Sequence, residues 1–257
     1  MSQFVVLSVE GSIATLQLNR PECMNALNVD MLNELLEKLK EVASSDASIL
    51  IISGNGNAFS AGGDIKTLLK DTDEETFEKV MDTINEVIMT LYALPKLVIS
   101  AINGPAAGLG LSFALAGDYV IAEKDAKVAM NFINIGLIPD GGGHFFLKQR
   151  LGDHKAMRVI WEGKVYDPNE ALVIGLIDEV CETLVMDAAC RKANEWLQKP
   201  IEAMIKSKKI ISDSSRHYLL EILRMEKIGQ IRMRETVDHQ EGINAFLEKR
   251  TPVFTGR

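Results

Sequence analysis

The chain has 257 residues, of which 47% are hydrophobic and 25% charged, and it carries a formal net charge of -8 with a pI near 5.2. This composition is that of a folded, soluble protein and excludes disordered, collagen-like and disulfide-scaffold chains. The length predicts one large domain, or one domain with a smaller appendage. The acidic balance argues against nucleic acid as a partner, because such binding depends on Lys and Arg neutralising phosphates.

Cysteine usage and the N-terminus indicate the compartment. Cys23, Cys181 and Cys190 are widely spaced, and no basic segment leads an apolar run at the N-terminus. We therefore expect a cytoplasmic protein without a signal peptide. Residues 97–116 carry no charge over a length that could cross a bilayer, but glycines and a proline at 103–110 interrupt them. This segment predicts a buried strand, a glycine loop and a buried helix, and no membrane partner.

Up to about residue 183, apolar patterns of strand and helix type alternate. The expected strands span 4–9, 13–18, 48–53, 97–102, 119–122 and 127–130. One expected helix follows a cap at Asn28, and another covers 74–94 and ends at Pro95. Apolar segments run into glycine-rich turns at 54–64, 103–110 and 139–143. Such alternation predicts an α/β fold whose ligand binds at the strand ends.

Only helices are expected beyond residue 183. They span 184–197, 201–211 and 215–235, with a last one from Asp238, where Asp238 and Glu241 have capping-box spacing. We therefore predict a core domain at 1–183 and a helical region at 184–257. The apolar stripes of this region require cover, either from the chain's own core or from a neighbouring subunit.

The glycine loops suggest a chemistry based on the backbone. Two loops at the ends of adjacent strands can aim two N–H donors at one point, which is how an oxyanion is stabilised. Glycines also serve tight turns and close packing without any ligand. The four histidines, His144, His154, His217 and His239, lack the spacing of metal ligands or of a catalytic triad, so no metal site is predicted.

Four motifs follow one another along the chain. They are Asn-Arg-Pro at 19–21 with Asn-Ala-Leu at 25–27, Phe-Ser-Ala-Gly-Gly-Asp-Ile at 59–65, Asn-Gly-Pro-Ala-Ala-Gly-Leu-Gly at 103–110, and Gly-Leu-Ile-Pro-Asp-Gly-Gly at 136–142. In order and spacing they resemble the signatures of the enoyl-CoA hydratase/isomerase, or crotonase, superfamily, and residues 241–250 resemble that family's last helix. The resemblance implies a crotonase-type spiral of β-β-α turns with a C-terminal all-helical trimerisation region, as a homotrimer or a dimer of trimers.

The same resemblance implies acyl-CoA thioester substrates, with coenzyme A as part of the substrate and no other cofactor. It assigns the oxyanion donors to the backbone N–H groups of Gly63 and Leu109. The resemblance implies that the adenine of coenzyme A lies near Cys23, Met24, Ala61 and Ile65, with Lys66 close to the phosphates. Lys249 would reach a coenzyme A bound by a neighbouring subunit. Many relatives carry a basic residue where this chain has Glu22.

Hydratases of this family use two carboxylates, one that orients and deprotonates water and one that manages the proton at the α-carbon. Here the two glutamate positions fall on Ser112 and Phe132, which are expected to line the pocket and cannot act as general bases. Asp140 remains. Pro-Asp-Gly is a common turn signal, but in several isomerase branches of the family an acid in this context is the proton shuttle. An apolar pocket would raise the pKa of Asp140.

These residues predict an isomerase that shifts a double bond from the 3-enoyl to the 2-enoyl position, with Asp140 moving the proton and an enolate held by Gly63 and Leu109. Two alternatives stay open. The chain could be a hydratase with a non-standard arrangement of water, or a catalytically weak protein that binds acyl-CoA. His144 lies one helical turn after Asp140, where it could modulate the acid or cap the local structure.

Overall fold

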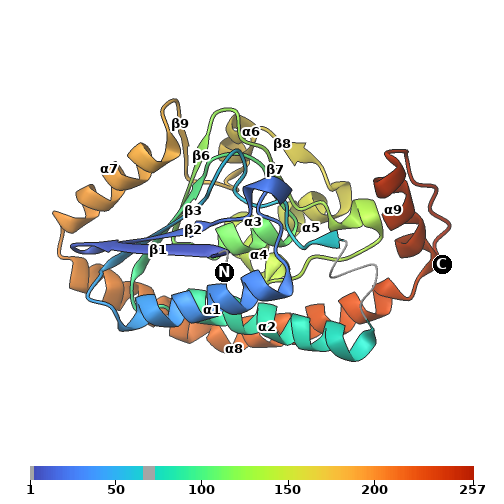
Figure 1. Cartoon of the computed structure of the whole chain (residues 1–257), viewed down its shortest axis with the longest axis horizontal. Helices are drawn as coiled ribbons and strands as arrows, with labels where there is room; N and C mark the ends of the chain where they lie inside the picture. Colours follow the sequence, from blue (N-terminus) through green and yellow to red (C-terminus); the bar gives the residue numbers. More distant parts are fainter. Residues whose placement is uncertain (1–2, 66–72) are drawn as a thin grey trace.

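The computed structural model describes residues 3–65 and 73–257. Within these residues the chain forms one large and one small β-sheet enclosed by helices (Figure 1), so the predicted α/β class is confirmed. The large sheet has the order β1-β2-β3-β4-β6-β9. Its strands are β1 (Val5–Glu10), β2 (Ile13–Leu18), β3 (Ile49–Gly54), β4 (Leu97–Ile102), β6 (Tyr119–Glu123) and β9 (Glu179–Cys181).

The predicted N-terminal hairpin is confirmed. Strands β1 and β2 pair antiparallel with Val5 opposite Leu18, and Gly11 makes the turn between them at a φ of 57°. All further pairings in the large sheet are parallel. The parallel strands β3 and β4 are buried along their whole length, which is why their sequences are continuous apolar runs rather than alternating ones.

A smaller sheet repeats the path of the large one. It consists of β5 (Ala106–Ala107), β7 (Val128–Ala129) and β8 (Val165–Tyr166). Strand β5 follows β4 and β7 follows β6, while Ser60, beyond β3, forms a parallel bridge to Ala106. Each turn of the chain therefore contributes a long strand to the large sheet and a short strand or bridge to the small one, and a helix then follows. This is the expected spiral of β-β-α turns.

The helices cover both faces of the large sheet. They are α1 (Val29–Ser44), α2 (Glu74–Tyr92), α3 (Leu109–Leu115), α4 (Gly143–Leu151), α5 (Asp153–Glu162), α6 (Pro168–Ile174), α7 (Val185–Leu197), α8 (Ile201–Arg234) and α9 (Val237–Glu248), with short 3-10 helices at Pro21–Cys23 and Phe132–Ile135. The predicted cap of α1 is confirmed, because the Asn28 side chain accepts a hydrogen bond of 3.0 Å from the Met31 N–H.

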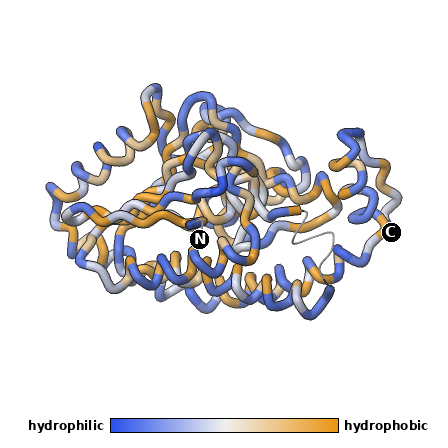
Figure 2. Tube along the Cα trace, viewed as in Figure 1, coloured by the Kyte–Doolittle hydropathy of each residue, from blue (hydrophilic) through white to orange (hydrophobic). Residues whose placement is uncertain are grey.

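Two hydrophobic cores lie on opposite faces of the sheet. Leu50 and Ile52 of β3 pack in the core that contains α1 and α2, whereas Ile49 and Ile51 pack in the core that contains α7. Figure 2 shows the apolar strands in the interior and hydrophilic stretches along the outer helices. The sheet is thus fixed from both sides, and its strand ends carry the loops that matter for function.

Two boundaries in the helical region correct the sequence prediction. Residues 201–234 form the single helix α8, not two helices interrupted near residue 212. The serines in the middle remain helical because their hydroxyls bond to carbonyls of the preceding turn, with Ser215 Oγ 2.8 Å from the Ile211 carbonyl oxygen. Helix α9 is capped by Thr236, whose hydroxyl accepts from the His239 N–H, and not by Asp238. Asp238 instead accepts hydrogen bonds from Thr255 and Gly256 of the C-terminal tail.

The apolar stripes of the C-terminal helices are covered to different extents by the chain itself. Leu219, Leu223 and Ile243 are buried, whereas Phe246 and Leu247 remain exposed by 58% and 40%. Helix α7 packs on the sheet, α8 lies beside α2, and α9 packs against residues 132–135. The division at residues 183/184 and the assembly of three subunits stay predictions.

Candidate active site

Two glycine loops meet backbone to backbone at the ends of β3 and β4. The Ala107 N–H donates a hydrogen bond of 3.0 Å to the Ser60 carbonyl oxygen. A Cβ atom at Gly62 would lie 2.6 Å from the Ala107 carbonyl oxygen and 3.3 Å from the Leu109 nitrogen, and Gly62 has a φ of +93°. A side chain at Gly62 is therefore excluded twice, by space and by backbone conformation.

This close packing leaves two backbone donors available. Gly63 is bridged to Leu27 through hydrogen bonds that use the Gly62 carbonyl and the Asp64 N–H. Leu109 is the first residue of α3, so its N–H has no partner within that helix. Among the described residues, nothing accepts a hydrogen bond from the N–H of Gly63 or of Leu109. Both residues line one cavity, where two such donors can stabilise an oxyanion.

The segment after the hairpin holds the first loop. A largely buried ion pair joins Arg20 to Asp64, with Nη1 and Oδ2 3.2 Å apart. The fully buried Asn25 side chain donates to the carbonyls of Asn55 and Ala58 at 2.9 and 2.7 Å. The motifs at 19–21 and 25–27 therefore contact the loop after β3, because the side chains of Arg20 and Asn25 bind polar groups of that loop.

The cavity beside the loops has a volume of about 700 Å³. One wall comes from α2 through apolar residues such as Phe77 and Met81, and another comes from the chain's own α9 and tail, including Phe246 and Phe254. Among the described residues that line this cavity, Asp140 is the only carboxylic acid. The cavity is therefore mainly apolar, with one acid, two backbone N–H donors and polar side chains that include Asn131 and Arg250.

Asp140 is 8% exposed and has few polar neighbours. Its Oδ2 accepts one long hydrogen bond of 3.2 Å from Gln230 Nε2, and its Oδ1 has no partner among the described residues. Burial raises the pKa of this carboxyl well above 3.8, and the nearby charge of Glu226 raises it further. A raised pKa suits a group that must both take up and return a proton.

Helix α8 supplies two polar residues beneath Asp140 that the sequence analysis did not identify. Glu226 is 2% exposed, and its carboxylate accepts from the backbone N–H groups of Gly142 and His144 at 2.7 and 3.0 Å. It also contacts His144 Nδ1 at 2.8 Å. Gln230 is 1% exposed and bonds to Ile138 as well as to Asp140. A signal existed in the sequence, because the buried stripe of Leu219 and Leu223 continues onto these polar residues at helical spacing.

Six of the residues predicted for the site line the same cavity. They are Ala61, Gly63, Ile65, Leu109, Phe132 and Asp140. Cys23 and Met24 are not among its lining residues, but the Met24 carbonyl accepts from the Ala61 N–H at 2.9 Å and thus lies next to the cavity wall. Lys249 ends α9 with a φ of 55°, directly before the lining residue Arg250. Lys66 lies outside the described residues.

The prediction that Ser112 lines the pocket is wrong. Ser112 is fully buried in α3, and its Oγ lies 3.8 Å from Met130 Sδ. Gly141 and Gly143 pack over it, so a Cβ atom at Gly143 would lie 3.0 Å from the Ser112 oxygen. The glycine turn after Asp140 therefore separates this side chain from the cavity. Glu22 is exposed and contacts Cys23 Sγ at 3.6 Å.

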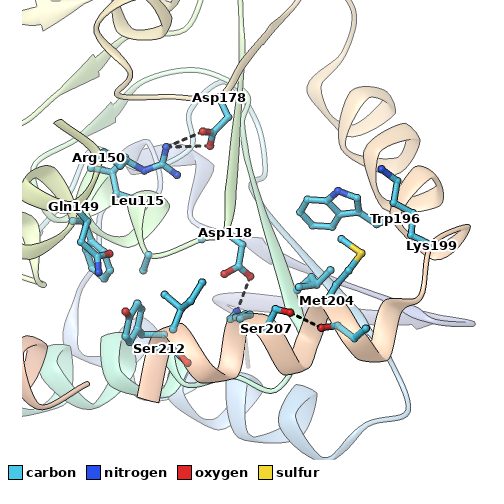
Figure 3. A pocket seen from close by; sticks show the side chains of 18 of the residues that line it. Leu115, Asp118, Gln149, Arg150, Asp178, Trp196, Lys199, Met204, Ser207 and Ser212 are labelled. Atoms are coloured by element: carbon cyan, nitrogen blue, oxygen red, sulfur yellow. Dashed lines mark hydrogen bonds and ion pairs between the residues drawn. The ribbon is translucent and has the colours of Figure 1, made fainter. Parts of the chain in front are cut away.

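A second cavity of about 960 Å³ lies between α7, α8 and the sheet (Figure 3). Four of its charged residues are paired with one another, Arg150 with Asp178 and Lys208 with Asp118, and Lys199 pairs with Glu195 outside the cavity. None of the residues predicted for the site lines it. Across the described ranges, no cluster of His, Cys, Asp or Glu is suited to hold a metal ion, and no helix has the length and apolar character needed to span a membrane.

A spiral of β-β-α turns that presents two backbone N–H donors at its strand ends defines the crotonase class of folds. The enoyl-CoA hydratase/isomerase family model matches residues 8–257, and the chain belongs to this family of acyl-CoA enzymes. It is 46% identical, over 98% of its length and 99% of the relative, to YhaR of Bacillus subtilis, whose name refers to enoyl-CoA hydratases/isomerases. It is 36% identical over both full lengths to the 1,2-epoxyphenylacetyl-CoA isomerase of Escherichia coli.

A solved structure confirms the fold. The enoyl-CoA hydratase of Mycobacterium avium subsp. paratuberculosis superposes with a TM-score of 0.88 and 28% identity, covering 98% of each chain. Relatives of this chain are thus named both as isomerases and as hydratases.

The raised pKa of Asp140 predicts how stability depends on pH. The folded protein binds this proton more tightly than the unfolded chain does, so the contribution is most favourable below pH 3.8 and is lost as the pH rises through the folded-state pKa. Asp140→Asn cannot lose that proton. Its free energy of unfolding, measured with urea between about pH 4 and about pH 8, should exceed that of the wild type by a margin that grows with pH.

Asp46→Asn provides the control for this experiment, because Asp46 is an exposed acid. Over the same range, the margin of Asp140→Asn should grow by more than that of this control. Equal changes for the two variants would contradict the burial of an ionisable Asp140.

Proposed function

We propose that this enzyme isomerises a 3-enoyl thioester of coenzyme A to the 2-enoyl thioester, with Asp140 as its proton shuttle. One observation carries the proposal. Asp140 is the only carboxylic acid among the described residues of a cavity that is also lined by Gly63 and Leu109, whose N–H groups have no acceptor among those residues. Moving a double bond requires one group that takes and returns a proton, together with stabilisation of the enolate between these steps.

The mechanism uses these groups in sequence. Asp140 removes a proton from C2 of the substrate, between the thioester carbonyl and the double bond. The electrons move to the thioester oxygen, which accepts hydrogen bonds from Gly63 and Leu109, each worth about 3 kcal/mol in the transition state. The protonated Asp140 then delivers the proton to C4. The double bond ends at C2–C3, and no water is consumed.

The apolar character of the cavity favours isomerisation over hydration. A hydratase must hold and deprotonate a water molecule, and Phe132 and the buried Ser112 offer no carboxylate for this. Full-length similarity to an isomerase that acts on an acyl-CoA ester supports the same choice. Hydration with a non-standard water arrangement, and acyl-CoA binding without turnover, are the outcomes that the assay below must separate from it.

Binding of coenzyme A completes the proposal. Its adenine would lie near Cys23, Met24, Ala61 and Ile65, with Lys66 near the phosphates. Lys249 would reach a coenzyme A held by a neighbouring subunit in a homotrimer or a dimer of trimers. Coenzyme A enters as part of the substrate, and the enzyme acts in the cytoplasm.

Asp140→Asn tests the shuttle directly. The amide cannot accept the proton, so conjugation of a 3-enoyl-CoA, followed by absorbance, should fall to background while binding of the thioester in calorimetry persists. Hydration of a 2-enoyl-CoA, followed separately, should be slow in both wild type and variant. Asp46→Asn should behave as the wild type.

The results separate the three readings of the site. Undiminished conjugation by Asp140→Asn would refute the proposal. Rapid hydration by the wild type, without conjugation, would favour a hydratase, and binding without either reaction would favour a protein that only binds acyl-CoA.

Leu109→Pro tests the oxyanion donor. Proline removes the N–H, and its ring suits the first position of a helix, where Leu109 lies. Leu109→Ala shortens the side chain comparably but keeps the N–H. The proline variant should therefore lose about 100- to 1,000-fold in kcat relative to the alanine variant. Equal rates for the two variants would mean that this N–H does not act on the substrate.

A further inference from the structure

Helix α8 faces the loop that carries Asp140 with two polar side chains one helical turn apart. Glu226 and Gln230 lie at i and i+4, so they project from the same face. Both are almost completely buried, although α8 is otherwise apolar on this side at Leu219 and Leu223. Buried polar groups reduce stability unless they are hydrogen bonded, so their presence here calls for a role beyond packing.

Gln230 contacts the acid itself. Its Nε2 donates to the Ile138 carbonyl oxygen at 2.6 Å and to Asp140 Oδ2 at 3.2 Å. The amide is therefore fixed at one end by the backbone while its other contact holds one carboxyl oxygen. Asp140 Oδ1 is buried and has no partner among the described residues, so the contact with Gln230 is the hydrogen bond that orients the carboxyl.

Glu226 holds the turn behind the acid. Gly141 and Gly142 adopt left-handed conformations, with φ of 60° and 77°, and glycines in a turn are easily reoriented. The Glu226 carboxylate accepts from Gly142 N–H, His144 N–H and His144 Nδ1. These contacts fix both ends of the turn that follows Asp140 and allow the Glu226 charge to be buried.

We propose that Glu226 and Gln230 are positioning residues of the reaction: Gln230 orients the Asp140 carboxyl through Oδ2, and Glu226 fixes the glycine turn and keeps a negative charge beside the acid. This inference rests on the proposed function of Asp140. The two carboxyl groups differ in surroundings, since Glu226 has three N–H contacts and Asp140 has one long one. Asp140, whose pKa is raised by burial and by the charge of Glu226, is therefore the carboxyl suited to carry the mobile proton.

The other charged groups on neighbouring elements are paired with acids other than Asp140. His144 of α4 contacts Glu226, and Lys227, the next residue on α8, pairs with Glu78 and Asp82 of α2. Arg250 lines the cavity but pairs with Glu241 and Glu248. The pKa of Asp140 is raised first by burial and then by the charge of Glu226. Removing that charge should make Asp140 ionise at lower pH and become a weaker base.

The proposed roles predict that substitutions of Glu226 and Gln230 shift the pH profile of kcat/KM for 3-enoyl-CoA conjugation in opposite directions. Activity should rise with pH as Asp140 ionises. Glu226→Gln removes the repelling charge and should move this rise to lower pH by about one unit, with a lower kcat at the plateau. Gln230→Met removes a donor to the carboxylate and should move the rise to higher pH. KM should change little in either variant.

Glu221→Gln is the matched control, because it removes the same charge from the exposed face of α8. Its pH profile should coincide with that of the wild type. A general loss of structure would lower activity without moving the profiles in opposite directions. If Glu226→Gln does not fold, the Gln230→Met profile alone tests the orienting contact.

The outcomes distinguish this inference from the function on which it rests. An active Asp140→Asn would refute the proposed function. An inactive Asp140→Asn, together with unshifted profiles for Glu226→Gln and Gln230→Met, would leave the function standing and overturn the positioning role. Shifts of both variants in the same direction would overturn it as well.

Discussion

The site depends on the backbone-to-backbone approach of two glycine loops. The loop after β3 and the loop after β4 meet through the Ser60 carbonyl and the Ala107 N–H, and the approach at Gly62 leaves no room for a side chain. The loops are held by parallel strands buried on both faces and by the Arg20–Asp64 ion pair. Gly63 and Leu109 line a common cavity, and in the proposed mechanism their N–H groups act there as fixed dipoles that stabilise developing charge without reorganisation.

The surroundings of Asp140, the acid that lines the same cavity, set its pKa. Asp140 lies in an apolar wall with one weak hydrogen bond, while the neighbouring Glu226 has strong ones. Burial and a like charge both disfavour ionisation of Asp140 and raise its pKa, so ionising this group in the folded protein costs stability. In the proposed mechanism the long helix α8 contributes to the chemistry as well as to the packing, because it carries both Glu226 and Gln230, which contact Asp140 and the turn after it.

The sequence was sufficient for the fold and for most of the cavity. Continuous apolar strands and glycine turns predicted the α/β order, and the motifs pointed to Gly63, Leu109 and Asp140. Ser112 was misassigned because a position in an apolar helix does not reveal whether the turn at Gly141–Gly143 covers it. Glu226 and Gln230 were missed because they lie more than 80 residues from the loop they contact. The break expected near Ser212 did not occur, because serine hydroxyls can bond within a helix.

The central claim is that a single carboxyl group moves a proton within the substrate and that water takes no part. A 3-enoyl-CoA deuterated at C2 should be converted in water enriched in oxygen-18, and the products examined by mass spectrometry. The account predicts a 2-enoyl-CoA that carries part of the deuterium at C4 and no oxygen-18 in the acyl chain. A 3-hydroxyacyl-CoA labelled with oxygen-18 as the main product would contradict it.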